Sequence, residues 1–302
     1  MIRKTFALRF RALLSGSPDG VPPWTRAVAD GTDLGLFAPT DAPWIVHADI
    51  ATTIGGIRAL LMQALHPGSL AGVVQHSRYE EDVVGRLNGT IRWLTISTFG
   101  ARETLEVEAE RVRRLHDRVR GSYTDTTGHQ RSYRASDQDL LQWVHIAFTD
   151  SFLRVHQRYG VRAIDADAYV RLWGAAVAPL GLSSPPQSES ELETQLQVYR
   201  PLLRVDDRTR RVVKFVRRAP LPRGAKPVYR LLFWAAVDTL PDDVRSALGL
   251  RRPPRRLVRA VTHGLLRAMR FALGTTSPLE EAALGRRTRL DDASEASGRM
   301  LA

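Results

Sequence analysis

Cysteine is absent from this chain of 302 residues. Without thiols there is no disulfide framework, no cysteine-type zinc site, no iron–sulfur cluster and no thiol nucleophile. Long apolar runs are absent as well. The longest covers about seven residues, Leu231 to Val237, far short of the ~20 that a membrane-spanning helix needs. What is present is an ordinary globular composition, 43% hydrophobic and 25% charged, which is enough for a sizeable core.

The amino-terminal residues carry no pattern typical of export. The stretch MIRKTFALRFRALL is basic and mildly amphipathic, and Arg9 and Arg11 interrupt the apolar run that a signal peptide needs. We therefore expect a cytoplasmic protein.

The positive charge is concentrated in the last third of the chain. The net charge is +12, and residues 200–302 hold 23 Lys and Arg against 10 Asp and Glu. Within this part, residues 254–273 form a basic amphipathic pattern of the kind that contacts the inner face of an anionic membrane peripherally. The alternative is a core helix with a solvated arginine face. Nucleic acid is not expected as a partner, because no aromatic residues alternate with the arginines and no binding motif is present.

Apolar residues recur at helical spacing through most of the chain, so we predict an all-α, multi-helix fold. The predicted division is an irregular arm over 1–50, one catalytic domain over 51–275 and a flexible tail over 276–302. Within the domain, 122–134 is predicted to be a polar loop, and 212–216 to hold a short strand pair.

Two histidines border apolar helix faces and could bind a flat, apolar cofactor. His116 follows Arg113 by one helical turn, and His145 precedes Phe148 by three residues on the next predicted helix. Haem suits a pair of helices that each offer a histidine, because imidazole binds its iron and arginine pairs with a propionate or with dioxygen. The alternative for either histidine is an ordinary hydrogen-bonded core residue. His66 and His76 are predicted to be a helix end and a loop residue.

Other catalytic patterns are missing. The chain has no HExxH, no Glu-x-x-His pair, no Gly-x-Ser-x-Gly and no phosphate-binding loop. Zinc hydrolase, di-iron and serine hydrolase chemistry therefore lack their usual signatures.

An ordered set of short motifs carries a resemblance to a known family. The set is Leu65-His66-Pro67, Gln75-His76-Ser77, the Arg113-x-x-His116 pair, Tyr133-x-Ala135 and Trp143-Val144-His145. In this order and spacing, over about residues 35–270, the chain resembles the MpaB-type oxygenases and the catalytic domain of rubber oxygenase (latex clearing protein).

The resemblance implies a globin-like helical core that holds haem b. His145 matches the histidine that is the proximal iron ligand in rubber oxygenases, and Arg113 matches the arginine of their distal Arg-x-x-Lys. His116 stands where that lysine would be, so it is expected either to ligate the iron or to hydrogen-bond dioxygen. The expected catalytic residues are Arg113 and His116, the haem-binding residues His145, His116 and Arg113, and the metal ligand His145.

The function expected from the resemblance is a haem-dependent oxygenase that uses dioxygen on a hydrophobic, unsaturated isoprenoid or lipid. An apolar channel for it would be lined by Trp93, Leu141, Phe148 and Phe152, with ordinary core packing as the alternative for at least half of them. Two other functions stay open. One is a non-catalytic haem- or lipid-binding protein of the same fold, and the other is a membrane-associated scaffold.

Overall fold

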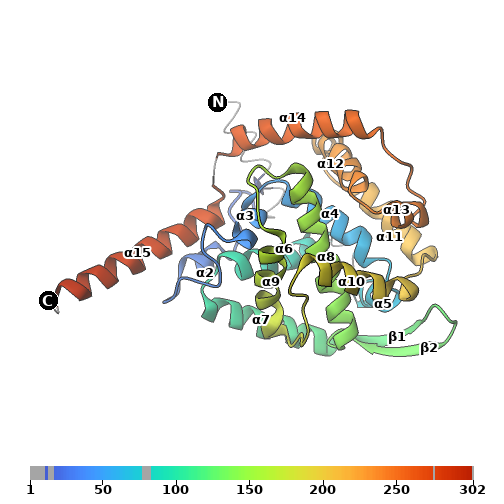
Figure 1. Cartoon of the computed structure of the whole chain (residues 1–302), viewed down its shortest axis with the longest axis horizontal. Coiled ribbons are helices and arrows are strands. Elements are labelled where there is room, and N and C mark those ends of the chain that lie inside the picture. The colour runs from blue at the N-terminus through green and yellow to red at the C-terminus, as the bar shows by residue number, and fades with distance from the viewer. Residues whose placement is uncertain (1–10, 13–16, 77–82, 275, 301–302) are drawn as a thin grey trace.

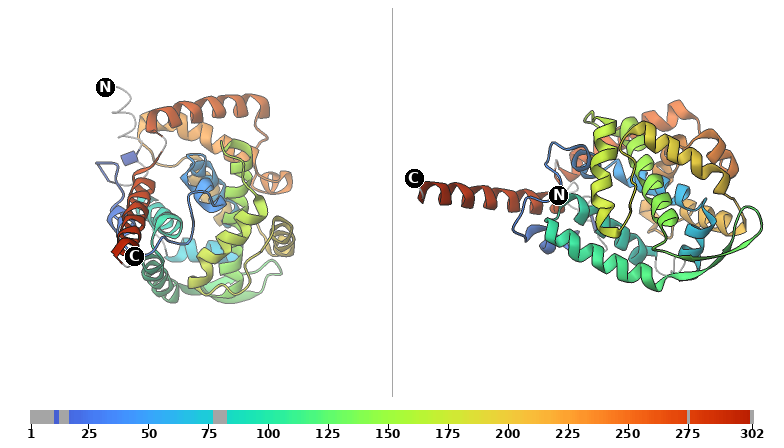
Figure 2. Two further views of the ribbon diagram at one scale, coloured as in Figure 1. Left: turned by 60° about the vertical axis from the view of Figure 1, so that its left-hand side comes forward. Right: turned by 60° about the horizontal axis from the view of Figure 1, so that its bottom comes forward.

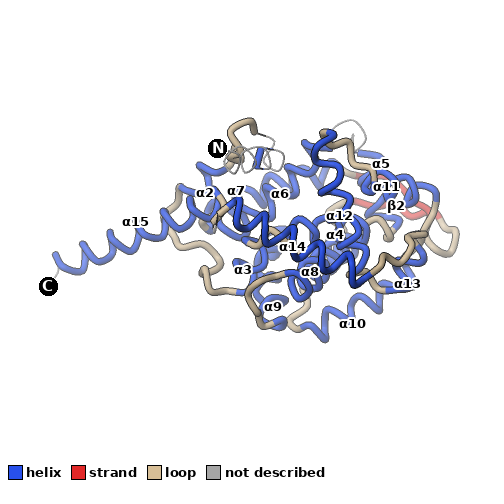
Figure 3. Tube along the Cα trace, turned by 90° about the horizontal axis from the view of Figure 1, so that it is seen from above, coloured by secondary structure: helices blue, strands red, loops and turns tan. Residues whose placement is uncertain are grey.

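The computed structural model describes residues 11–12, 17–76, 83–274 and 276–300, and in them the chain forms fourteen α-helices and one hairpin (Figure 1). The helices are α2 (Thr25–Ala29), α3 (Ala42–Ala48), α4 (Thr52–Gln63), α5 (Pro67–His76), α6 (Val83–Phe99), α7 (Arg102–Arg118), α8 (Gln138–Tyr159), α9 (Ala166–Val177), α10 (Glu189–Tyr199), α11 (Asp207–Arg217), α12 (Lys226–Asp238), α13 (Asp242–Ala247), α14 (Arg255–Leu273) and α15 (Pro278–Met300). Three short 3₁₀ turns, η1 (Ala178–Leu180), η2 (Arg200–Leu202) and η3 (Arg223–Ala225), and two strands, β1 (Arg120–Thr124) and β2 (Gln130–Arg134), complete the list. The helical prediction is confirmed, and Figure 3 shows the strands at one end of a helical body.

Helix α4 is the centre of the core, packed between α8 and α12. It can approach α8 closely because Gly55 has no side chain there: a Cβ atom at this position would lie 2.5 Å from the Phe152 ring. Helix α4 ends at Gln63, before the His66-Pro67 pair, and Pro67 starts α5 in the position where its missing N–H costs nothing.

A buried ion pair fixes α8 against α4. Arg58 Nη2 lies 2.6 Å from Asp150 Oδ2, and both side chains are almost completely buried. The second guanidinium nitrogen, Arg58 Nη1, donates to Ser151 Oγ at 2.7 Å. Removing one partner of such a pair leaves an unpaired charge in the core, which lowers the free energy of unfolding by about 3–5 kcal/mol. The pair therefore sets the position of the α8 segment that contains His145.

Four regions correct the sequence-based predictions, and the first is 122–134, which forms a hairpin rather than a loop. Strands β1 and β2 pair antiparallel from Arg120 opposite Arg134 to Thr124 opposite Gln130. The turn is held by Asp125, whose side chain accepts backbone N–H groups from Thr127 and His129. Nearly all residues of the two strands are polar, so the alternation of apolar and polar residues that predicts a strand is missing.

The second correction concerns 212–216, which is helical. Asp206 and Thr209 form a reciprocal cap at the start of α11, and Val212, Val213 and Val216 are buried at helical spacing. The local β-propensity of valine is overridden by packing of this face on the core.

The third correction is the carboxyl-terminal tail, where α15 forms a helix that extends away from the body (Figure 2). Its first turns are anchored by buried Leu279, Ala283 and Arg286, and Arg286 donates to the backbone carbonyls of Val28 and Phe99. Only these few turns meet the body, so the sequence shows no long apolar stripe.

The fourth correction is the amino-terminal arm, whose described part contains α2 and α3. The predicted division into arm, domain and tail otherwise stays a prediction.

Helix α14 packs on α12 and buries Val258, Thr262, Leu266 and Met269. Leu257 and Val261 are exposed, although the apolar pattern places them on its inner side. Among the described residues no single helix is long and apolar enough to cross a bilayer; the pair α3 and α4, bent by 96°, passes that test by length and composition alone. Membrane contact and cytoplasmic location stay predictions.

Candidate functional site

His145 lies in the middle of α8 and is buried, with 5% of its surface exposed. Neither ring nitrogen has a hydrogen-bond partner, and within the described part of the chain no other histidine has both nitrogens buried and unbonded. Buried polar atoms in folded proteins are nearly always bonded, and an unpaired one costs about 1–3 kcal/mol. Such an atom calls for a specific explanation.

Burial lowers the pKa of His145 from 6.5 to about 3. The imidazole is therefore neutral at ordinary pH and keeps a nitrogen lone pair. A neutral imidazole is the form in which histidine binds metals. The ring thus has the charge state, the dryness and the unused donor atom that an iron ligand needs.

Apolar residues lie one turn to either side of His145 on α8, next to the polar residues Gln142 and Thr149. One turn earlier, Leu141 packs with Val177, Leu182 and Trp93. One turn later, Phe148 is only half-buried although it lies in the middle of the helix. His145 lines neither the surface hollow beside Trp234 nor the one beside Pro179. Leu141 and Phe148 therefore give the ring apolar neighbours along α8, and Thr149 donates a hydrogen bond to the His145 carbonyl rather than to the ring.

Arg113, on α7, is half-exposed and held by two partners. Its Nε and Nη2 atoms donate to Glu110 Oε2 at 3.1 and 2.7 Å, and Nη1 donates to the Pro179 carbonyl of η1. The structure therefore gives this guanidinium a fixed position and a carboxylate partner, one helical turn before His116.

His116 is half-buried, and burial lowers the pKa of its ring despite the opposing charge of Asp117. Its side chain makes no hydrogen bond to any described residue. It follows buried Val112 by one turn, so it borders the inner side of α7.

The structure connects Arg113 to the neighbourhood of His145 through turn η1, but no hydrogen bond joins the three predicted residues. Helix α7 packs on α6 and on η1, and it lies below α6 in Figure 1. Arg113 binds Pro179, and Val177, two residues earlier, packs on Leu141 beside His145. Turn η1 thus links α7 to the face of α8 that carries His145. No hydrogen bond joins Arg113 or His116 to the His145 ring, whose nitrogens are free.

A single buried imidazole fits haem better than a protein-made metal centre. Across the described residues, no group of three or more His, Cys, Asp or Glu side chains could hold a metal ion. Haem needs only one or two protein ligands, because its porphyrin fills the other positions. The residues present therefore fit this cofactor.

His66 and His76, the other two histidines of the family motifs, have hydrogen-bond partners. His66 Nδ1 accepts the Ser69 backbone N–H at 3.3 Å, and His76 Nε2 lies 2.7 Å from the Arg120 carbonyl. His76 ends α5 rather than lying in a loop, and Ser77 of its motif lies outside the described residues.

The four residues expected to line a channel divide into two pairs. Phe152 and Leu141 are buried in core clusters, whereas Trp93 and Phe148 are half-buried. Core packing therefore accounts for Phe152 and Leu141.

Two features are not predicted from the sequence. The Arg58–Asp150 pair has only a weak signal, a lone arginine in an apolar helix. A cluster of Arg217, Arg218 and Arg230 beside Trp234 has a stronger one, a long basic stretch without acidic residues.

The architecture and site define a helical protein with a dry, uncharged imidazole at its centre. Residues 44–272 match the family model described as ER-bound oxygenase mpaB/B'/Rubber oxygenase, catalytic domain. The match covers more than half of the chain, so this protein belongs to that family, as its motifs predict. Membership identifies it with a family of oxygenases, which are oxidoreductases that use dioxygen and an organic substrate. Neither the curated proteins nor the solved structures include a match to the chain.

Proposed function

We propose that the protein is a haem b-dependent oxygenase that acts with dioxygen on a hydrophobic, unsaturated isoprenoid or lipid. The observation that supports this most strongly is the pair of buried, unbonded nitrogens of neutral His145. Family membership supports the oxygenase chemistry, and the apolar cluster around Leu141, one turn from His145, supports an apolar cofactor and substrate.

In this proposal His145 would hold the cofactor through one of its ring nitrogens. Bound there, haem would supply the activation of dioxygen. The neighbouring residues of the Leu141 cluster exclude water from the imidazole, which keeps it neutral and able to bind.

Arg113 and His116 act from α7. The guanidinium of Arg113 is held by Glu110 and Pro179, so its positive charge has a fixed place and can orient a polar group of the reactants. Neutral His116 has one N–H to donate and one nitrogen to accept a proton, and neither is used by a described residue. It can therefore hold or transfer a proton beside the bound substrate, or supply a second ligand.

The experiment is an absorption spectrum of protein expressed with a haem precursor, followed by oxygen-uptake assays with isoprenoid and fatty-acid alkenes. We expect a Soret band, a carbon monoxide adduct after reduction, and oxygen uptake that depends on one substrate class. A colourless protein would contradict haem binding.

A second candidate is a non-catalytic haem- or lipid-binding protein of the same fold. The ion pair that occupies Arg113 favours it, because a guanidinium bonded to Glu110 and Pro179 has less to offer a reactant. Haem binding without oxygen uptake on any alkene would support this candidate over the oxygenase.

A further inference from the structure

A basic surface lies on the opposite side of α4 from His145. Between Asp207 and Asp238 the chain has no acidic residue, while it has nine basic ones. This stretch forms α11, η3 and α12, and α12 packs on α4, which separates it from α8.

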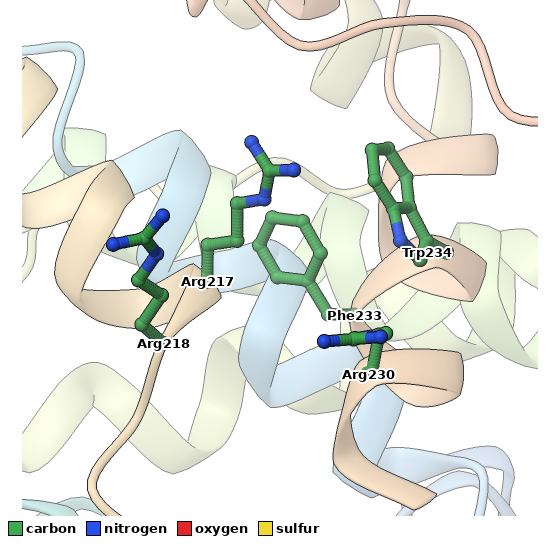
Figure 4. Close-up of a pocket in the computed structure, with 5 residues that line it drawn as sticks. All are labelled: Arg217, Arg218, Arg230, Phe233 and Trp234. Atoms are coloured by element: carbon green, nitrogen blue, oxygen red, sulfur yellow. The ribbon is translucent and has the colours of Figure 1, made fainter. Parts of the chain in front are cut away.

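Three of these arginines gather around one hollow of about 350 Å³ (Figure 4). Arg217 is the last residue of α11, Arg218 follows it, and Arg230 projects from α12. Phe233 and Trp234, one turn further along α12, complete the lining. A hollow of this size lies within the range of small-molecule sites.

Local bonds hold the two helix ends in place. The Tyr229 hydroxyl donates to the Val216 carbonyl at 2.5 Å, and burial raises the pKa of Tyr229, so it remains a donor. The Arg218 backbone N–H donates hydrogen bonds to the Lys214 and Phe215 carbonyls. The guanidinium of Arg217 lies 5.4 Å from the centre of the Trp234 ring, a cation–π distance. The hollow is therefore built by tertiary contacts between α11 and α12.

The three guanidinium groups have no carboxylate partner among the described residues. All three side chains are exposed. Other arginines have carboxylate partners: Arg255 and Arg259 share Asp238, and Arg58 binds Asp150. No ion pair to Arg217, Arg218 or Arg230 occurs in the part of the chain that the structure describes. Like charges held close together repel, and a multivalent anion between them removes that repulsion.

We propose that this hollow binds a phosphate or diphosphate group carried by an organic molecule. Planar guanidinium groups bind phosphate oxygens through paired N–H donors. The exposed face of half-buried Trp234 provides apolar contact for the organic part of the ligand. The site does not depend on the proposed oxygenase function, because α4 lies between it and His145.

The test is calorimetric titration of the full chain with inorganic pyrophosphate at low ionic strength. We compare the wild type with Arg217→Gln, Arg218→Gln and Arg230→Gln. The matched control is Arg256→Gln, which changes an exposed arginine of α14. We expect each hollow variant to weaken binding by about tenfold, one lost charged contact, while the control stays within about twofold. Equal weakening by the control, or full binding by the three variants, would overturn the proposal.

Two further arms identify the source of the phosphate and the role of the tryptophan. Cosedimentation with phosphatidic acid vesicles against neutral phosphatidylcholine vesicles tests a lipid headgroup. Binding that depends on Arg217 supports the proposal for whichever probe shows it. If the protein binds neither pyrophosphate nor phosphatidic acid vesicles, the proposal is refuted. Phenyl phosphate should bind the wild type more tightly than inorganic phosphate does, and Trp234→Ala should remove that difference; an unchanged difference would refute the apolar contact.

Discussion

Two buried histidines, His47 on α3 and His145 on α8, differ in a way that separates a structural role from a ligand-binding one. Both are almost completely buried, and burial lowers the pKa of each to about 3. His47 Nδ1 lies 2.9 Å from Thr98 Oγ1, and Nε2 lies 3.0 Å from the Tyr169 hydroxyl. His145 has no partner for either nitrogen.

The hydrogen-bond network even assigns the His47 tautomer. The Thr98 hydroxyl donates its one proton to the Leu94 carbonyl, so it must accept from Nδ1–H of His47, and Nε2 then accepts from Tyr169. His47 thereby ties α3 to α6 and α9. Burial and pKa alone do not distinguish the two rings, but hydrogen bonding does.

The strongest consequence should follow from His145→Ala, which removes the proposed haem ligand. The variant should lose essentially all bound haem, because the only dry, unbonded imidazole of the described core is gone. Haem content and the Soret band measure this. His47→Asn is the matched control and should keep its haem. Full haem content in His145→Ala would remove the proximal-ligand assignment.

The next effect is the destabilisation caused by His47→Leu. It leaves the Thr98 and Tyr169 hydroxyls buried with one bond fewer each, so we expect a loss of about 2–4 kcal/mol in the free energy of unfolding. Urea denaturation measures it, and haem stoichiometry should not change. A variant as stable as the wild type would show that His47 does not tie these helices together.

A smaller effect is acid sensitivity of the haem-free protein. The pKa of His145 is about 3 in the folded protein, below the unfolded value of 6.5. The folded state therefore has its full stability relative to the unfolded state above pH 6.5, and this stability is lost as the pH falls from 6.5 toward 3. At pH 5 the free energy of unfolding should be lower by about 2 kcal/mol for each such ring. We expect His145→Leu to show a smaller fall in unfolding free energy between pH 7.5 and 5 than the wild type does. An equal fall would mean that the ring is accessible to protons.

The weakest effect is expected from His116→Ala. Its half-buried ring has no hydrogen bond, so stability should change by less than about 1 kcal/mol and haem content should not change. Oxygen uptake or the resting absorption spectrum should change if the ring acts in the site. Loss of haem from this variant would make His116 a second essential ligand and weaken the contrast with His145.

Much of the helical architecture can be predicted because its signals are local. Pro67 separates α4 from α5, and Asp165 accepts the backbone N–H groups of Asp167 and Ala168 at the start of α9. The hairpin and α15 escape prediction because neither presents a long apolar face. The valines of α11 suggest a strand because local propensity does not include the core that covers them.

The helical class, the family motifs and the identity of the candidate site residues can all be read along the chain, because they depend on spacing and residue type. Three-dimensional packing was needed to establish which histidine has both ring nitrogens buried without hydrogen bonds, that Arg113 is engaged by Glu110 and Pro179, and that three arginines of α11 and α12 meet beside Trp234. Burial and partnership arise when segments distant in the chain pack together, and no local pattern records which polar atoms that packing leaves unpaired.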